Sequence, residues 1–254
     1  MGTHLQTTWP TVVEVVGHTH RFDYIEFSGE YAPYDLHGLD NFCRAAELHG
    51  LGTMIKLDQE PRTWLAQRAI GAGFQSVLFA DIRSADDVRA CVWAVRPDTP
   101  TGGGTYGAAD RRNSYWMEAA TAGYIKALEE IVVVVMIEKR EAVEQLDEIL
   151  AVPGVDMIQW GPSDYAMSIG RPGGWYDPEV RAVERDVLAR SLAAGVQPRA
   201  EITEPSDAQA YLDQGVQHFC IGTDVHILHA WLDERGGRLA QILGRDDAGH
   251  DQAG

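Results

Sequence analysis

The sequence contains few cysteines. Cys43, Cys91 and Cys220 are odd in number, lie far apart and form no C-x-x-C pair. Small secreted domains that depend on disulfides usually carry an even and closely spaced set, so this class of protein is excluded. Isolated cysteines of this kind behave as small apolar side chains. We therefore expect three reduced, mostly buried thiols in a cytoplasmic protein.

The chain also lacks a long apolar run and an excess of positive charge. Its longest apolar run is too short to span a bilayer, and no basic segment followed by an apolar one opens the sequence. Asp and Glu number 38 against 21 Lys and Arg, which gives a net charge of −17. This charge disfavours nucleic acids and anionic membranes as partners. An anionic small molecule stays compatible with it, because a bound metal or an Arg can reverse the field locally.

A regular alternation of strand and helix patterns runs along the chain. Short apolar runs predict strands at residues 3–7, 22–27, 52–57, 76–81, 132–138, 157–161, 197–202 and 218–224. Apolar residues at helical spacing predict helices at residues 11–17, 36–49, 61–72, 84–95, 140–151, 178–194, 205–214 and 226–243. This count indicates one (β/α)8 TIM barrel domain over residues 1–243, followed by a disordered tail at 244–254. A doubly wound open sheet is the alternative.

Two acids stand where apolar runs stop. A β-branched run ends on Glu138, and residues 155–160 continue through Gly161-Pro162-Ser163 into Asp164. The helical pattern at 140–151 lies between the two runs, so they form a parallel βαβ unit that brings both carboxylates to the same end of neighbouring strands. Two converging carboxylates need a cation, and Mg²⁺ or Mn²⁺ suits oxygen ligands. The alternative is that Glu138 caps a helix and Asp164 makes a turn.

Residues 98–116 fall outside the alternation. They form a loop that is long enough to act as a lid over a functional site. Gly102-Gly103-Gly104 within this loop is a weak signal for phosphate binding, because the sequence lacks the Lys-Ser/Thr pair and the strand–turn–helix frame of a phosphate-binding loop.

Several segments resemble the HpcH/HpaI aldolase/citrate lyase family, most closely its metal-dependent class II pyruvate aldolases of the 4-hydroxy-2-oxoheptanedioate aldolase type. The segments that carry the resemblance are 22–26, 29–33, 135–142, 146–156, 161–164 and 221–224. The likeness extends from about Gly2 to Leu239. It implies a TIM barrel, usually hexameric with an exchanged C-terminal helix, and a divalent ion that Glu138 and Asp164 hold. The family chelates a 2-oxo acid, typically pyruvate, on that ion.

The resemblance implies a carbon–carbon lyase. A metal on the 2-oxo acid acts as a Lewis acid and stabilises the enolate that aldol cleavage produces. No Schiff-base lysine is then required, in a chain that holds only three lysines. The main prediction is an aldolase that joins or cleaves a 2-oxo acid and an aldehyde, with Mg²⁺ or Mn²⁺ on Glu138 and Asp164. The residues assigned to substrate binding are Gly161, Pro162, Ser163 and Arg199.

Four positions around the expected site depart from the family. Tyr31 stands where those aldolases have a His, Lys56 replaces an Arg, and Met136 replaces a Gln. An Asp found before the fourth strand is lost within residues 69–71. Because both metal ligands are retained, these changes predict altered chemistry. The alternative functions are therefore an enzyme that uses the same enolate for decarboxylation, hydration or acyl-type cleavage, and a non-catalytic relative that binds a ligand.

Tyr31, Lys56 and Glu30 are the predicted catalytic residues. A phenol has an ordinary pKa near ~10, so Tyr31 is a better acid than an imidazole; alternatively, it lines the pocket. Lys56 keeps a positive charge near the substrate oxygen without the fork of an Arg, or it pairs with Asp58 or another neighbour. Glu30 is expected to orient a water on the metal. His37 and a hydroxide on the metal are the alternative bases.

Arg199 and Glu201 alternate onto one face of the seventh predicted strand. A buried Arg and a buried Glu each need a partner. Either the two side chains pair with each other, or Arg199 receives a substrate carboxylate.

The C-terminal stretch 227–243 is apolar and contains Trp231. A terminal helix with this much apolar surface is a liability on a monomer. We expect it to pack on a neighbouring subunit of a homo-oligomer, either a trimer or a hexamer.

Overall fold

Eight parallel strands form a closed barrel in the computed structural model, which describes residues 1–111 and 120–245. The strands are β1 (Gly2–Leu5), β2 (Tyr24–Ser28), β3 (Gly52–Leu57), β4 (Ser76–Phe79), β5 (Val132–Ile137), β6 (Met157–Trp160), β7 (Gln197–Ile202) and β8 (His218–Thr223). They follow one another in chain order, and β1 pairs with β8 to close the barrel. The predicted TIM barrel is confirmed, and the open sheet is excluded.

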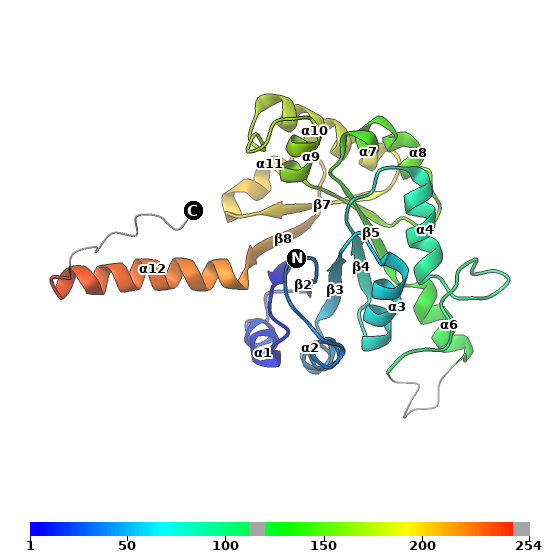
Figure 1. Ribbon diagram of the computed structural model, residues 1–254, viewed down its shortest axis with the longest axis horizontal. Helices are drawn as coiled ribbons and strands as arrows, with labels where there is room; N and C mark the ends of the chain where they lie inside the picture. Colours follow the sequence, from blue (N-terminus) through cyan, green and yellow to red (C-terminus); the bar gives the residue numbers. More distant parts are fainter. Residues whose placement is uncertain (112–119, 246–254) are drawn as a thin grey trace.

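Helices surround most of the barrel (Figure 1). Among the described residues they are α1 (Pro10–His18), α2 (Leu36–Leu48), α3 (Arg62–Ala72), α4 (Ala85–Val95), α6 (Ala122–Glu129), α7 (Arg140–Glu144), α8 (Leu146–Leu150), α9 (Pro162–Ser168), α10 (Pro178–Ala193), η1 (Pro205–Asp207), α11 (Ala208–Leu212) and α12 (Asp224–Ile242). Local signals explain several starts: Asp35 caps α2, and Ser84 with Asp87 forms a capping box on α4.

Four helical regions differ from the prediction, one of them the expected helix at 205–214, which forms the short 3-10 helix η1 followed by α11. The expected helix at 140–151 is interrupted at Gln145, which ends α7 and precedes α8. The predicted pattern also missed α6 and α9. Helix α9 begins at Pro162, where a proline suits the first turn, so Asp164 lies on a helix rather than in a turn. The predicted disordered tail falls mostly on residues 246–254, outside the described residues.

The interior of the barrel is divided into an apolar and a charged half. Met54, Leu78, Val134 and Met136 from β3, β4 and β5 form a buried apolar cluster. On the other side, β1, β2, β6 and β7 direct polar side chains inward, and His4, Glu26, Gln159 and Arg199 are all buried. The outward-facing residues of the strands pack against the helices in the main core. The division means that one half of the barrel is held by ion pairs and hydrogen bonds.

The long loop that was expected to act as a lid lies at the other end of the barrel. It follows the carboxyl end of α4, and Arg111 at its far end donates to the carbonyl of Ala72, at the carboxyl end of α3. These helix ends face the amino ends of the strands. Residues 98–111 therefore cannot cover a site at the carboxyl ends of their own barrel, and residues 112–116 lie outside the described part.

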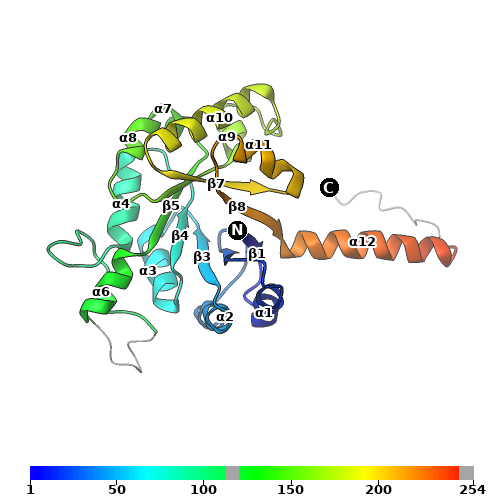
Figure 2. The same ribbon diagram turned by 180° about the vertical axis from the view of Figure 1, so that it is seen from behind.

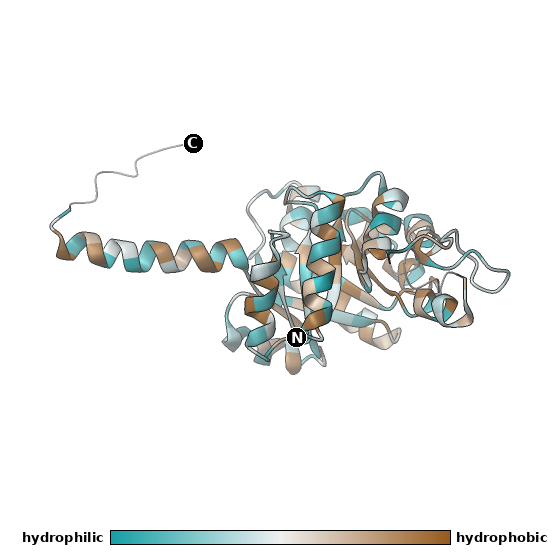
Figure 3. Cartoon of the chain, turned by 90° about the horizontal axis from the view of Figure 1, so that it is seen from below, coloured by the Kyte–Doolittle hydropathy of each residue, from teal (hydrophilic) through white to brown (hydrophobic). Residues whose placement is uncertain are grey.

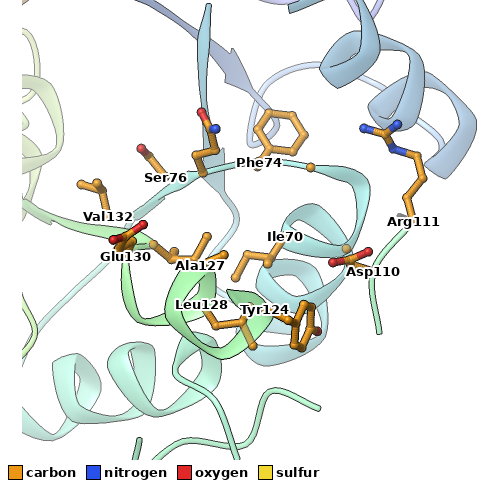
Figure 4. A pocket seen from close by; sticks show the side chains of 14 residues that line it. Ile70, Phe74, Ser76, Asp110, Arg111, Tyr124, Ala127, Leu128, Glu130 and Val132 are labelled. Atoms are coloured by element: carbon orange, nitrogen blue, oxygen red, sulfur yellow. The ribbon is translucent and has the colours of Figure 1, made fainter. Parts of the chain in front are cut away.

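A cavity between α3 and α6 opens at this amino end of the barrel. Ile70, Phe74, Tyr124 and Leu128 contribute to its lining, together with Arg111 of the long loop (Figure 4). Glu138 and Asp164 stand at the opposite end of the strands. This cavity is therefore not part of the candidate active site.

Helix α12 projects away from the barrel (Figures 1 and 2). Its start is tied to β1, because the Asp224 carboxylate accepts a 2.9 Å hydrogen bond from the Gln6 amide. Beyond that point none of its residues is buried, and Trp231 is 59% exposed. Apolar residues recur along its length (Figure 3). No helix in the described parts of the chain is both long and apolar enough to cross a membrane.

Candidate active site

Glu138 and Asp164 lie at the carboxyl ends of two adjacent strands, as predicted. Glu138 directly follows β5, and Asp164 is in the first turn of α9, just after β6. The two strands pair in register, with Ile137 opposite Trp160. Glu138 is 3% exposed, whereas the side chain of Asp164 is 41% exposed. One buried and one accessible carboxylate therefore share the end of the barrel where such folds carry their chemistry.

The Glu138 carboxylate has one oxygen engaged by the backbone. Its Oε1 accepts a 2.7 Å hydrogen bond from the amide of Asp81. Burial raises the pKa of Glu138, and the nearby charge of Asp164 adds to the rise, although the Asp81 amide and the Lys56 ammonium oppose it. A divalent cation between the two carboxylates would remove their mutual repulsion. The donor set therefore fits a hard metal ion such as Mg²⁺ or Mn²⁺.

Gly161 makes room for this carboxylate. A Cβ at this position would lie 2.6 Å from the Cβ of Glu138 and 2.7 Å from its Oε2. Any side chain here would displace Glu138, so the glycine is required by close packing. Two of the other residues assigned to substrate binding lie next to Gly161: Pro162 is half-buried, and Ser163 is exposed on the first turn of α9.

Lys139 and Asp81 complete the surroundings of the two acids, and the sequence analysis missed both roles. The ammonium of Lys139 lies 2.7 Å from Asp164 Oδ1 and 2.7 Å from Asp81 Oδ1. Burial alone would lower the pKa of Lys139, but its hydrogen bonds to Asp164 and Asp81 raise it, so the side chain stays charged. Asp81 follows β4 as Glu138 follows β5. That shared position was the signal in the sequence.

The three predicted catalytic residues meet beside this centre. The Lys56 ammonium, on the inner side of β3, lies 2.5 Å from Glu30 Oε2 and donates a hydrogen bond to the hydroxyl of Tyr31. Its nitrogen is also 4.5 Å from the centre of the Tyr31 ring. Glu30 is thus the neighbour that pairs with Lys56, in place of Asp58. Whether Glu30 orients a water on a metal stays a prediction.

The protonation of this cluster follows from its burial and charges. Desolvation raises the pKa of Tyr31 to about 12, although the Lys56 ammonium opposes the rise. Burial alone would lower the pKa of Lys56, but Tyr31 and Glu30 raise it above its ordinary value. At neutral pH the cluster therefore holds a neutral phenol and a charged ammonium. Such a pair donates hydrogen bonds, and neither of its two groups is deprotonated to act as a base.

His37, the alternative base, is exposed on the first turn of α2. It lines a shallow cavity with Trp9 and Tyr34, between the loops that follow β1 and β2. Among the described residues it forms no hydrogen bond or ion pair with Glu30, Tyr31 or Lys56. His37 therefore stands apart from the cluster of Glu30, Tyr31 and Lys56, and its role as the alternative base stays a prediction.

The prediction for Arg199 needs correction. Its side chain is fully buried inside the barrel, where its Nη2 lies 2.5 Å from Glu26 Oε2 and its Nε donates a 2.7 Å hydrogen bond to the Tyr24 hydroxyl. It also donates to the side chain of Gln159. These partners leave no exposed face for a substrate carboxylate. Its acidic partner is Glu26 on β2, not Glu201.

A second group of metal-type ligands lies within the same charged half of the barrel. One ligand atom each from His4, Glu26 and Cys220 falls within 4.8 Å of the others. However, the Arg199 guanidinium is 2.5 Å from Glu26 and 3.3 Å from His4, so a cation already occupies this space. His4 also lies 3.3 Å from Glu201. We interpret this group as a buried charge network.

The chain is similar in sequence and in fold to known aldolases. A hydroxypyruvate/pyruvate aldolase from Roseovarius nubinhibens is 33% identical over 225 residues, which cover 86% of this chain and 84% of that protein. A 4-hydroxy-2-oxovalerate aldolase from Rhodococcus jostii is 31% identical over 227 residues, covering 87% and 84%. The crystal structure of an HpcH/HpaI aldolase from Desulfitobacterium hafniense superposes with a TM-score of 0.84 at 23% identity, covering 94% and 92% of the two chains, and shows the same fold.

The family model described as HpcH/HpaI aldolase/citrate lyase matches residues 1–230. This range includes all eight strands and both carboxylates. The chain therefore belongs to the HpcH/HpaI aldolase/citrate lyase family.

Proposed function

We propose that this protein is a carbon–carbon lyase that cleaves or forms an aldol bond between a pyruvate-type 2-oxo acid and an aldehyde, with Mg²⁺ or Mn²⁺ bound by Glu138 and Asp164. The observation that carries the proposal is the pairing of these two carboxylates at the carboxyl ends of β5 and β6. The named relatives are aldolases, which supports the reaction class.

The ion would supply a Lewis acid that draws electrons from the 2-oxo group during carbon–carbon bond cleavage. Glu138 and Asp164 would hold it, and Gly161 leaves the space that Glu138 needs. Hard ions of this size keep open positions for a substrate when only one or two carboxylates bind them. The charged Lys56 stands beside the same centre and adds a fixed positive charge for the developing oxyanion.

Tyr31 would transfer the proton to or from the oxygen that is an aldehyde on one side of the reaction and a hydroxyl on the other. Lys56 donates to the phenol oxygen, and Glu30 also hydrogen-bonds to the Tyr31 side chain, so a substrate oxygen would compete with Glu30 for the phenol proton. In the direction of bond formation, Tyr31 would donate this proton to the aldehyde oxygen as it becomes a hydroxyl. In the direction of cleavage, the same oxygen would have to receive the proton. The raised pKa of about 12 keeps Tyr31 protonated at neutral pH, so it has a proton to donate but releases it less readily than an ordinary phenol.

A second reaction type follows from the same observation. The neutral phenol of Tyr31 is a weak base. It therefore favours reactions that end by protonating an enolate over reactions that start by deprotonating a hydroxyl. Decarboxylation is such an alternative to the aldol reaction, whereas hydration and acyl-type cleavage would share the enolate but still need a base. A relative that binds a ligand without turnover is the third candidate.

The experiment uses the purified protein with Mn²⁺ and measures two reactions. Condensation of pyruvate with glycolaldehyde reports aldol activity, and decarboxylation of oxaloacetate reports enolate formation alone. We expect both reactions, and their loss on addition of EDTA. Oxaloacetate turnover without condensation would replace the aldolase proposal with the second reaction type. Mn²⁺ binding without either reaction would support the non-catalytic relative.

Two variants test the ligands. Glu138→Gln and Asp164→Asn each remove an anionic oxygen, so both should fold but lose Mn²⁺ binding and enolate formation. Glu144→Gln is the matched control, because Glu144 is an exposed acid on the neighbouring α7. Unchanged Mn²⁺ affinity in both site variants, measured by calorimetry, would end the metal-site proposal.

We also propose a homo-oligomer, a trimer or a hexamer, in which α12 packs on a neighbouring subunit. Exposed Ile227, Leu228 and Trp231 lie on α12, while Phe219 and Ile221 on β8 are only partly buried. A helix from a second copy would cover both surfaces.

The three buried free cysteines suit a reducing compartment, and we propose the cytoplasm.

A further inference from the structure

Asp81 has an unusual backbone conformation at the end of β4. Its φ is +56°, in the left-handed region that few residues other than glycine adopt, although Asp and Asn tolerate it best. This conformation directs the Asp81 amide at Glu138 Oε1, which accepts its hydrogen bond at 2.7 Å. The unfavourable conformation is thus coupled to a contact with a proposed metal ligand.

The side chain of Asp81 reaches the other ligand through Lys139. The Lys139 ammonium lies 2.7 Å from Asp81 Oδ1 and 2.7 Å from Asp164 Oδ1. The Lys139 side chain is 11% exposed, so water screens these contacts poorly. Asp81 therefore contacts both proposed ligand residues, one through its amide and the other through a shared cation.

Lys139 has two opposing effects on the centre. It holds one oxygen of Asp164, which orients the carboxylate, but its positive charge repels a divalent ion that would bind the same carboxylate. Asp81 reduces this repulsion, because it gives the ammonium a second anionic partner. If the Asp81 charge is removed, Lys139 is left with Asp164 alone and competes directly with the metal for it.

We propose that Asp81 is a positioning residue of the metal centre, which shares the Lys139 ammonium with Asp164, weakens its competition with the metal and thereby raises the affinity for the divalent ion. The inference rests on the proposed function, in which Glu138 and Asp164 bind that ion. A purely structural role, in which Asp81 serves only the turn after β4, makes a different prediction for the variants below.

The test measures Mn²⁺ affinity by calorimetry on the EDTA-treated, folded protein. Asp81→Asn keeps a side chain that tolerates the left-handed backbone but loses the charge, and we expect it to weaken Mn²⁺ binding about tenfold. Lys139→Met removes the competing cation, so Mn²⁺ should bind at least as tightly as in the wild type. In the double variant, the cost of Asp81→Asn should fall below about threefold, because the cation that it controls is absent.

The outcomes separate this inference from the proposed function. A wild-type protein that does not bind Mn²⁺ would overturn both. A wild-type protein that binds Mn²⁺, with an equal affinity in Asp81→Asn, would overturn only the role of Asp81. Equal costs of Asp81→Asn with and without Lys139 would assign Asp81 a purely structural role. If Asp81→Asn does not fold, Asp81→Gly replaces it, because glycine adopts the positive φ and removes the same charge. Weaker Mn²⁺ binding in the single variant Lys139→Met than in the wild type would contradict the proposal.

Discussion

The ammonium of Lys56 donates a hydrogen bond to the hydroxyl of Tyr31 and also lies 2.5 Å from Glu30. The phenol is therefore held through its oxygen by Lys56, and a hydrogen bond to Glu30 is among the causes that raise its pKa. These contacts hold the Tyr31 hydroxyl next to Lys56 and Glu30, even though 59% of the residue is exposed.

Tyr31→Phe should lower kcat by about two to four orders of magnitude, as expected for a positioned proton-transfer group. The KM for the 2-oxo acid should change much less, because the metal anchors that substrate. Steady-state kinetics with pyruvate and an aldehyde measure both constants. Near wild-type turnover in Tyr31→Phe would indicate that Tyr31 only lines the pocket and does not transfer a proton.

Tyr31→His introduces the histidine that the class II pyruvate aldolases resembled by this chain have at this position. An imidazole can accept a proton near neutral pH, so aldol activity should rise if Lys56 still polarises the oxo group. Comparison of pyruvate condensation in this variant and in the wild type measures the effect. No gain would indicate that the surrounding residues are built for another reaction.

Arg199→Met should lower the free energy of unfolding by about 3–5 kcal/mol, because it leaves the buried Glu26 carboxylate without its cation. The double variant with Glu26→Gln should recover much of the loss, since no buried charge then remains unpaired. Urea denaturation measures both changes. A rise in KM for the 2-oxo acid without loss of stability would instead support a substrate-binding role for Arg199.

His4 should make stability depend on pH. Burial alone would lower the pKa of His4, but Glu26 and contacts with Cys220 raise it well above 6.5 in the folded protein, and Glu201 lies on its other side. Because the folded pKa exceeds the unfolded value near ~6.5, this stabilisation is fully present below that pH. It is lost as the pH rises through the raised folded pKa.

The measurement is urea denaturation at a series of pH values for the wild type and for His4→Gln. The variant should show a smaller fall in stability on the alkaline side than the wild type does. His20→Asn, at an exposed position after α1 where asparagine tolerates the positive φ, is the control and should behave like the wild type. The same alkaline fall in His4→Gln would contradict the prediction.

Light scattering should give the mass of a trimer or of a hexamer of the 28.0 kDa chain. Trp231→Glu places a charge on the apolar surface of α12 and should shift the protein towards smaller species. Glu234→Gln, on the same helix, should leave the mass unchanged. A sharp monomer mass for the wild type would refute the proposed assembly.

Much of the fold follows from the sequence because strands and helices alternate with clear periodicity. The two carboxylates were predictable for the same reason, since each ends an apolar run that reads as a buried strand. The end of the barrel at which the long loop lies could also be predicted from the sequence. A loop that follows a helix and precedes a strand lies at the amino end of a barrel, so the lid interpretation of residues 98–116 contradicted the predicted fold itself.

The partners of the charged residues were not predictable. Arg199 and Glu201 share a face of β7, and their proximity in sequence suggested a pair. The closed barrel instead brings Glu26 of β2 to Arg199, across 173 positions of the chain, and only the folded structure supplies that contact. The role of Asp81 depends on a positive φ, which strand patterns do not report.

The division of the barrel interior also bears on how this sequence can change during evolution. In the apolar half, Met54 or Leu78 can be exchanged singly for a side chain of similar volume at small cost. In the other half, Glu26 and Arg199 must change together, because either one alone becomes an unpaired charge. Relatives should therefore carry both residues or neither. Their covariation would trace the history of this interior more clearly than the conservation of either residue alone.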